Sequence, residues 1–271
     1  MAVRARHDPQ VAVMQPAATA YRGHPPGRGS VRFRAARRGP ELWGVAGSAV
    51  LCLLAGCARQ PPPPDWQVNA KTAGERALTA YLSGDARVEA QELQRARSEI
   101  ARTGRADLLA RIELAHCAAQ VASLVFQPCA GFEALRADVP APERAYADYL
   151  AARVQAQDIG LLPEAQRGVA AGVATGLAEA AEAAEAANDA ALGAIADPLS
   201  RLVAAGVLFK AMRADPQVIA IAIDTASSQG WRRPLLAWLG VQLKRVELAD
   251  AGDEALRLRR RIALVLGGAA P

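Results

Sequence analysis

The sequence predicts an all-α fold made of antiparallel helical hairpins, arranged in a repeat-like array or an irregular bundle. Apolar residues form 52% of the 271 residues, which is enough for a core, but aromatic residues form only 4%. A core of Ala, Leu and Val suits closely packed helices, because Ala and Leu are strong helix formers. Alternating β-branched runs, which would indicate a sheet, are nearly absent.

From Trp66 onward, apolar residues recur at helical spacing and short polar breaks separate the helices. The first expected helix, 68–83, stops at a Ser-Gly-Asp break, and the second, 86–102, stops at Thr103-Gly104. The later helices are expected over 105–124, 129–137, 142–158, 164–194, 198–213, 215–228, 231–249 and 253–266.

Prolines set several of these boundaries. The segments 129–137 and 142–158 are expected to be short helices because Pro128, Pro140, Pro142 and Pro163 punctuate that part of the chain. The pairs Asp197-Pro198 and Asp215-Pro216 are typical helix starts, in which the Asp caps the helix and the Pro occupies the first turn without losing a hydrogen bond.

Two segments share a pattern of helix end, Gly-Asp turn and a second helix with spaced Ala and Leu. They are Ala80-Tyr81-Leu82-Ser83-Gly84-Asp85 and Leu248-Ala249-Asp250-Ala251-Gly252-Asp253. Both resemble tetratricopeptide repeats, although the 34-residue period is not sustained between them. Any antiparallel hairpin rich in Ala and Leu would show the same pattern, and either interpretation predicts packed helical hairpins.

Three glycines spaced by four, Gly168, Gly172 and Gly176, line one face of the expected helix 164–194. In a membrane such spacing is typical of helix dimerisation. Acidic residues follow within a few turns, so the segment cannot span a bilayer. We therefore expect a close helix contact followed by a solvated, alanine-rich helix.

An apolar stretch near the amino terminus, from Leu42 to Gly56, follows a group of arginines. It is shorter than the ~20 residues that a spanning helix needs, and it fits the apolar region of a signal peptide. It ends in Leu54-Ala55-Gly56-Cys57, which resembles the lipobox of bacterial lipoproteins. The resemblance implies that the chain is cut before Cys57 and that lipid is attached to this residue, which would anchor the mature protein to a membrane. The alternative is an uncleaved anchor with a chance match.

The predicted organisation follows from this boundary. Residues 31–56 form the signal peptide, 57–65 the lipidated Cys and a stiff spacer containing Pro61 to Pro64, and 66–271 the helical domain. Residues 1–30 make the leader longer than the ~15–30 residues of ordinary signal peptides, so we interpret them as a mis-assigned or disordered extension.

The positive charge belongs to the leader. Residues 1–56 contain eight Arg and two acidic residues, which leaves 24 basic and 25 acidic residues from Cys57 onward. The pI of 9.3 is therefore no indication of nucleic-acid binding, and no nucleic-acid partner is expected. Ala58 follows the lipidated Cys; in the sorting rule that the resemblance implies, an Asp there would retain the protein in the inner membrane. The outer membrane, facing the periplasm, is therefore favoured.

Two cysteines remain in the mature part, Cys117 and Cys129. An exported protein with two thiols is a good candidate for one disulfide, with two buried free thiols as the alternative. If the third helix reached Leu124, Cys117 would lie ~10 Å or more from its end, whereas a bridge needs Cα atoms within ~7 Å. The disulfide thus requires an early helix end or a sharp fold-back at Gln127-Pro128.

The sequence contains no catalytic signature. His116, the one histidine of the mature part, stands beside a single Cys, whereas zinc needs three or four ligands. No nucleophile elbow, metalloprotease motif or phosphate-binding loop is present. We expect neither enzymatic activity nor a cofactor.

Trp231, Arg232 and Arg233, with Trp238 one heptad later, form an aromatic and basic cluster. It is a candidate contact patch for a partner or for lipid headgroups. Alternatively the two tryptophans line one helix face and fill the core.

These observations favour a membrane-anchored, non-enzymatic helical scaffold that binds other envelope proteins. A carrier of a small ligand or lipid, with a cavity between helices, is the alternative. An envelope enzyme, for example one that acts on peptidoglycan, would need converging carboxylates or a Cys-His pair in a cleft.

Overall fold

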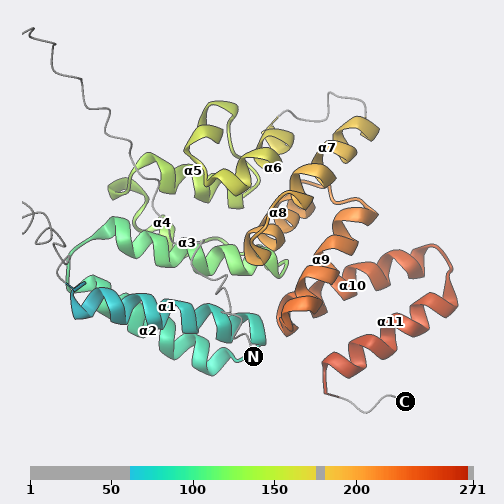
Figure 1. Ribbon diagram of the computed structural model, residues 1–271, viewed down its shortest axis with the longest axis horizontal. Helices are drawn as coiled ribbons and strands as arrows, with labels where there is room; N and C mark the ends of the chain where they lie inside the picture. The colour runs from blue at the N-terminus through green and yellow to red at the C-terminus, as the bar shows by residue number, and fades with distance from the viewer. Residues whose placement is uncertain (1–61, 175–180, 268–271) are drawn as a thin grey trace, which may run out of the picture. The chain divides into compact units, whose positions relative to one another are not determined.

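The computed structural model describes residues 62–174 and 181–267, and the helical domain within them is all-α as expected (Figure 1). The described part contains no strand. Its helices are α1 (Asp65–Ser83), α2 (Ala86–Ala101), α3 (Ala106–Ala122), α4 (Ala130–Glu133), α5 (Ala141–Leu150), α6 (Glu164–Ala174), α7 (Ala181–Gly193), α8 (Pro198–Lys210), α9 (Pro216–Gln229), α10 (Arg232–Leu248) and α11 (Gly252–Val265), with 3-10 turns η3 (Arg136–Asp138) and η4 (Ala156–Leu161).

Neighbours in the chain pack as hairpins, as Figure 1 shows for α1 with α2 and for α10 with α11. The first predicted Gly-Asp turn is a turn in the structure. The second was wrong, because Gly252 and Asp253 begin α11 and the chain turns at 249–251 instead. Gly84 has a φ of 87° and Asp85 caps α2 by accepting a hydrogen bond from Val88 N at 3.1 Å. At the second turn, Asp250 has a φ of 53°. Contacts between α3 and α8 and between α1 and α10 join distant hairpins, so the packing is not limited to neighbours along the chain.

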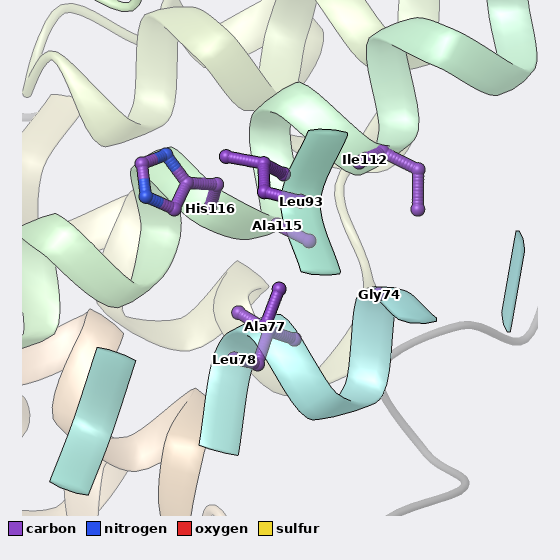
Figure 2. A pocket seen from close by; sticks show the side chains of 7 residues that line it. All are labelled: Gly74, Ala77, Leu78, Leu93, Ile112, Ala115 and His116. Carbon is purple, nitrogen blue, oxygen red and sulfur yellow. The ribbon is translucent and has the colours of Figure 1, made fainter. Parts of the chain in front are cut away.

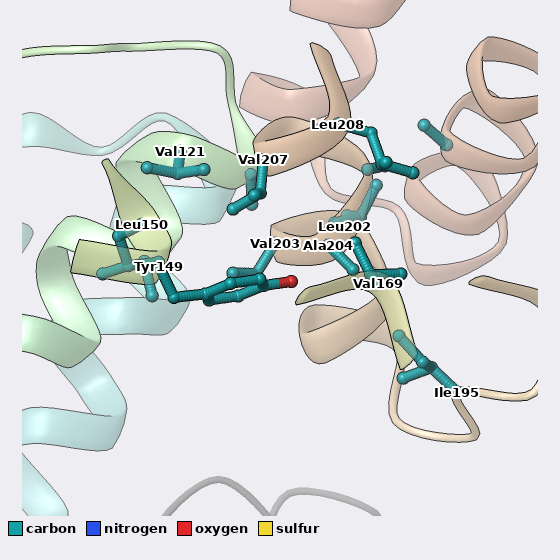
Figure 3. Close-up of a cluster of buried hydrophobic side chains, with 14 of the residues drawn as sticks. Val121, Tyr149, Leu150, Val169, Ile195, Leu202, Val203, Ala204, Val207 and Leu208 are labelled. Carbon is teal, nitrogen blue, oxygen red and sulfur yellow. The ribbon is translucent and has the colours of Figure 1, made fainter. Parts of the chain in front are cut away.

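The main core surrounds α8, which is apolar all round: each residue from Leu202 to Leu208 is buried. A helix buried on every side is expected to lack a polar face. Figure 3 shows side chains of α3, α5 and α6 converging on it, among them Val121, Tyr149 and Val169. A second cluster, built largely from alanines and smaller aliphatic residues, joins α1, α2 and α3.

Small residues permit the closest helix contacts. A Cβ atom on Gly206 would lie 2.8 Å from the backbone carbonyl carbon of Val121, so α8 crosses α3 at this glycine. On α6, a Cβ on Gly168 would lie 3.2 Å from that of Ala191, and one on Gly172 would meet the side chain of Asn188. The expected close contact thus forms between α6 and α7. The expectation of one helix over 164–194 was wrong, because residues at its two ends lie in contact. Gly176 lies outside the described residues.

Three expected helices are shorter in the structure. The third ends at Ala122, because Ser123 leaves the helix and Leu124 has a φ of 59°. The expected helix 129–137 consists of α4 and η3. The expected helix 142–158 was wrong beyond Leu150, since Ala152 has a φ of 56° and the chain continues into η4.

The predicted signal peptide, Cys57 and the spacer as far as Pro61 lie outside the described residues, as do 175–180. No helix in the described part of the chain is both long and apolar enough to cross a membrane.

Candidate functional site

Cys117 and Cys129 form a disulfide, with Cα atoms 5.9 Å apart. A third helix that reached Leu124 would have kept the two cysteines apart, but α3 ends at Ala122. The left-handed residue Leu124 turns the chain back, and Val125 N donates a hydrogen bond to Gln120 O at 2.8 Å. The bridge therefore fastens the short α4 segment against the side of α3.

A bidentate ion pair lies beside this bridge. The guanidinium of Arg97 on α2 donates to both carboxylate oxygens of Glu113 on α3, at 2.5 and 2.7 Å. Glu113 is 5% exposed, and this pairing, ahead of the opposing effect of burial, raises the pKa of Arg97. The carboxylate also fills the space beside Gly131, where a Cβ atom would collide with it. We interpret this ion pair as structural, because each charge has the other as its counter-ion.

The predicted Trp-Arg cluster is divided between the core and its edge. Trp238 is fully buried, and its indole Nε1 donates to Ala122 O at 3.0 Å. Trp231 is half-buried against two core clusters, and Arg232 is exposed. Arg233 lies 4.1 Å over the ring of Tyr81, a cation–π contact. The predicted contact patch is therefore largely occupied by other residues of the same protein, and Arg232 is the member that is exposed.

Arg233 belongs to a polar cluster that joins α1, α2, α3 and α10. One carboxylate oxygen of Glu89 lies 2.9 Å from His116 Nε2 and the other accepts from Arg233 at 3.3 Å. The Tyr81 and His116 rings meet edge to face at 5.6 Å. Burial raises the pKa of the Tyr81 hydroxyl, against the lowering effects of Ser123 and Arg233. His116, Glu89 and Arg233 thus have polar partners within the cluster, whereas the buried Tyr81 hydroxyl has no hydrogen-bond partner among the described residues.

A cavity beside His116 is too small for an organic ligand. Figure 2 shows its lining, which comes from α1, α2 and α3 and includes Leu78, Leu93 and Ile112. Its volume is about 10 Å³, the room of about one water molecule. The lining is apolar apart from the imidazole, so we interpret the cavity as a packing gap between three helices.

A larger depression runs along α10, and we call it the α10 groove. It is a shallow depression that is largely open to solvent, with a volume of about 440 Å³. Its lining residues are Ser123, Leu124, Phe209, Ala237, Gly240, Val241, Lys244 and Arg245. These residues come from the end of α3, from α8 and from successive turns of α10.

Three aromatic rings, those of Phe126, Phe209 and Trp238, contact one another next to this groove. Phe126, which is 36% exposed, stacks on Phe209 with ring centroids 6.2 Å apart. Phe209 in turn meets Trp238 edge to face at 5.7 Å. The Lys210 ammonium lies 5.4 Å over the Phe126 ring, and burial, followed by the charge of Arg153, lowers the Lys210 pKa. The three rings link the exposed Phe126 to the buried core.

Sequence reasoning missed the α10 groove. Leu124 was assigned to the apolar side of a helix, and the lining residues come from three segments far apart in the chain. The available signal was the glycine in the middle of α10, which has no role in a turn or cap. Within the described ranges, no group of three or more His, Cys, Asp or Glu side chains could hold a metal ion.

No family model, curated protein or solved structure that we compared with this chain matches it.

Proposed function

We propose that this chain is an envelope lipoprotein, anchored through lipid on Cys57, whose helical domain is a non-enzymatic scaffold for other envelope proteins. The observation that supports export is the disulfide between Cys117 and Cys129. Structural disulfides persist in oxidising compartments such as the periplasm and are rare in the cytosol. The lipobox-like Leu54-Ala55-Gly56-Cys57 supplies the matching address at the sequence level.

The scaffold role is supported by apolar surface on the carboxy-terminal hairpin. Leu248 at the end of α10 is 78% exposed, and Leu256, Leu264 and Leu266 on or after α11 are half-exposed or more. Groups of exposed large apolar side chains are typical of protein-interaction surfaces. A carrier function would instead favour an enclosed apolar pocket, whereas the cavity beside His116 has room for about one water.

One experiment tests anchor and scaffold together. The wild-type chain and a Cys57→Ser variant, each with a photo-crosslinking amino acid at Leu264, are expressed in a bacterium that is fed labelled palmitate. We expect the wild type to be labelled, processed and crosslinked to envelope proteins. The Cys57→Ser variant should be unlabelled and unprocessed, because the acylated thiol is missing. Cys52→Ser is the matched control, because Cys52 lies inside the apolar stretch that precedes Cys57 and lacks small residues before it, and this variant should behave as the wild type.

Labelling of Cys57→Ser at the wild-type level would refute the anchor. A wild-type protein that is labelled but crosslinks only to lipid from Leu264 would refute the scaffold role of this hairpin while leaving the anchor intact.

A further inference from the structure

Gly240, in the middle of α10, carries a conformational cost that nothing in the described structure explains. A glycine inside a helix is less favourable than alanine because it loses more backbone freedom. Gly206 and Gly172 are needed, since neighbouring atoms occupy the space where a Cβ would stand. A Cβ on Gly240 would meet nothing within 4 Å. Gly240 is itself exposed, so the missing side chain leaves space that is open to solvent within the α10 groove.

Apolar side chains line the α10 groove together with Gly240. They are those of Leu124, Phe209 and Val241. Leu124 holds its position through a left-handed backbone with a φ of 59°, which a branched side chain adopts at a cost. A left-handed residue also follows α5, α8 and α10, so the feature specific to this depression is the helical glycine that has no close neighbour.

The charges around the groove have one sign. Lys244 and Arg245 line it, and Lys210 stands at its edge over Phe126. Among the described residues, no carboxylate lies within 4.0 Å of these three cations. By contrast, Arg259 on the adjacent α11 pairs with Glu247 at 2.7 Å. Carboxylates of a partner would supply the missing counter-charges.

We propose that the α10 groove binds an extended acidic segment of a partner protein. Carboxylates of this segment pair with Lys244 and Arg245, while its apolar side chains rest on Phe209 and in the space above Gly240. The open surface along successive turns of α10 suits a peptide that contributes side chains in succession, and Lys210, next to Phe209, adds a third positive charge. This inference rests on the proposed scaffold function and names the chemistry of its partner.

The test is a selection with the purified full chain against a displayed library of random twelve-residue peptides. The selected peptides are then measured by fluorescence anisotropy. We expect them to be rich in Asp and Glu with interspersed apolar residues. Gly240→Leu should weaken binding by at least about tenfold, because the new side chain fills the groove. Lys244→Glu combined with Arg245→Glu should do the same through charge repulsion.

The matched control is Arg257→Glu combined with Arg260→Glu, which makes the same change in net charge on exposed positions of α11. It should change the affinity by less than about twofold, because salt screens the field of exposed charges that do not contact the peptide. Melting curves followed by circular dichroism establish that each variant is folded. Gly240→Leu should melt no lower than the wild type, since its Cβ has open space.

Three results would overturn the proposal: no selected peptide, selected peptides without acidic residues, or equal loss of binding in the control. A fourth would reassign the groove to a membrane surface, namely binding of phosphatidylglycerol vesicles through Lys244 and Arg245 with no acidic peptide selected. The selection uses no membrane, so its failure is distinct from a failure of palmitate labelling at Cys57.

Discussion

The crossing of α8 over α3 at Gly206 gives a sharp test of the packing, because alanine there should destabilise a helix that it would ordinarily favour. The added methyl group would lie 2.8 Å from the carbonyl carbon of Val121 and 2.9 Å from its Cγ1. The blocking atoms include backbone, which cannot rotate away. Moving α8 outward would loosen the most deeply buried helix in the core.

The magnitude follows from two opposing effects. Forcing an extra methyl group into a packed core costs about 1–3 kcal/mol, and backbone contact places Gly206→Ala at the upper end. Replacing glycine by alanine in a helix returns about 1 kcal/mol. We therefore expect a net loss of about 2 kcal/mol in the free energy of unfolding, or a fall in Tm of about 4–8 °C for a domain of this size.

Gly240→Ala is the internal control, since its Cβ has open space. It should stabilise the protein by about 0.5–1 kcal/mol through helix propensity alone. Urea unfolding followed by circular dichroism measures both variants against the wild type, with equal m-values required for the comparison. A Gly206→Ala variant as stable as Gly240→Ala would refute the close crossing of α8 and α3.

Two further perturbations test the supports of α3. The disulfide closes a loop over a sequence separation of 12, and it is removed by reduction or by Cys117→Ser with Cys129→Ser. Its loss should lower the free energy of unfolding by about 3 kcal/mol in the chain-entropy model. Urea unfolding with and without reductant measures this change, and a value below about 1 kcal/mol would contradict a stabilising role. Arg97→Ala leaves the carboxylate of Glu113 buried without its partner and should cost about 2–3 kcal/mol, less than for a fully buried pair because Arg97 is itself 36% exposed. Arg76→Ala, at a position that is 60% exposed in a 4.0 Å pair, should cost less than about 0.5 kcal/mol in the same assay, and equal effects of the two substitutions would count against a special role for Glu113.

Local signals in the sequence predicted the helices well. Asp197 and Asp215 cap α8 and α9 as expected, accepting hydrogen bonds from Ser200 N at 2.7 Å and Val218 N at 2.8 Å. These caps depend on neighbouring residues only, which is why spacing suffices to predict them. The end of α3 could not be predicted in this way, because alanine and valine alone do not indicate the left-handed turn at Leu124.

The sites depend on contacts across the chain, and here local patterns predicted less. The pairing of Arg233 with Glu89 spans 144 positions, so the sequence could suggest a cluster near Trp231 but not its partners. The cysteine pairing was foreseen from the number of thiols in the mature part, whereas the fold-back that permits it was not. The α10 groove combines segments whose proximity follows only from the packing of α8, α10 and the end of α3 around Trp238.

The contact between α1 and α10 has a consequence for how the domain unfolds. In an open repeat array each hairpin touches only its neighbours, so terminal hairpins can fray independently and unfolding can spread inward from either end. Here Glu89 and Tyr81 of the first hairpin are held by Arg233 of α10, and Trp238 of the same helix is bonded to the end of α3. Loosening the first hairpin must therefore release α10 as well. Non-covalent contacts of this kind convert a set of separable hairpins into one cooperative unit. Early and late parts of the chain are then stabilised by the same contacts.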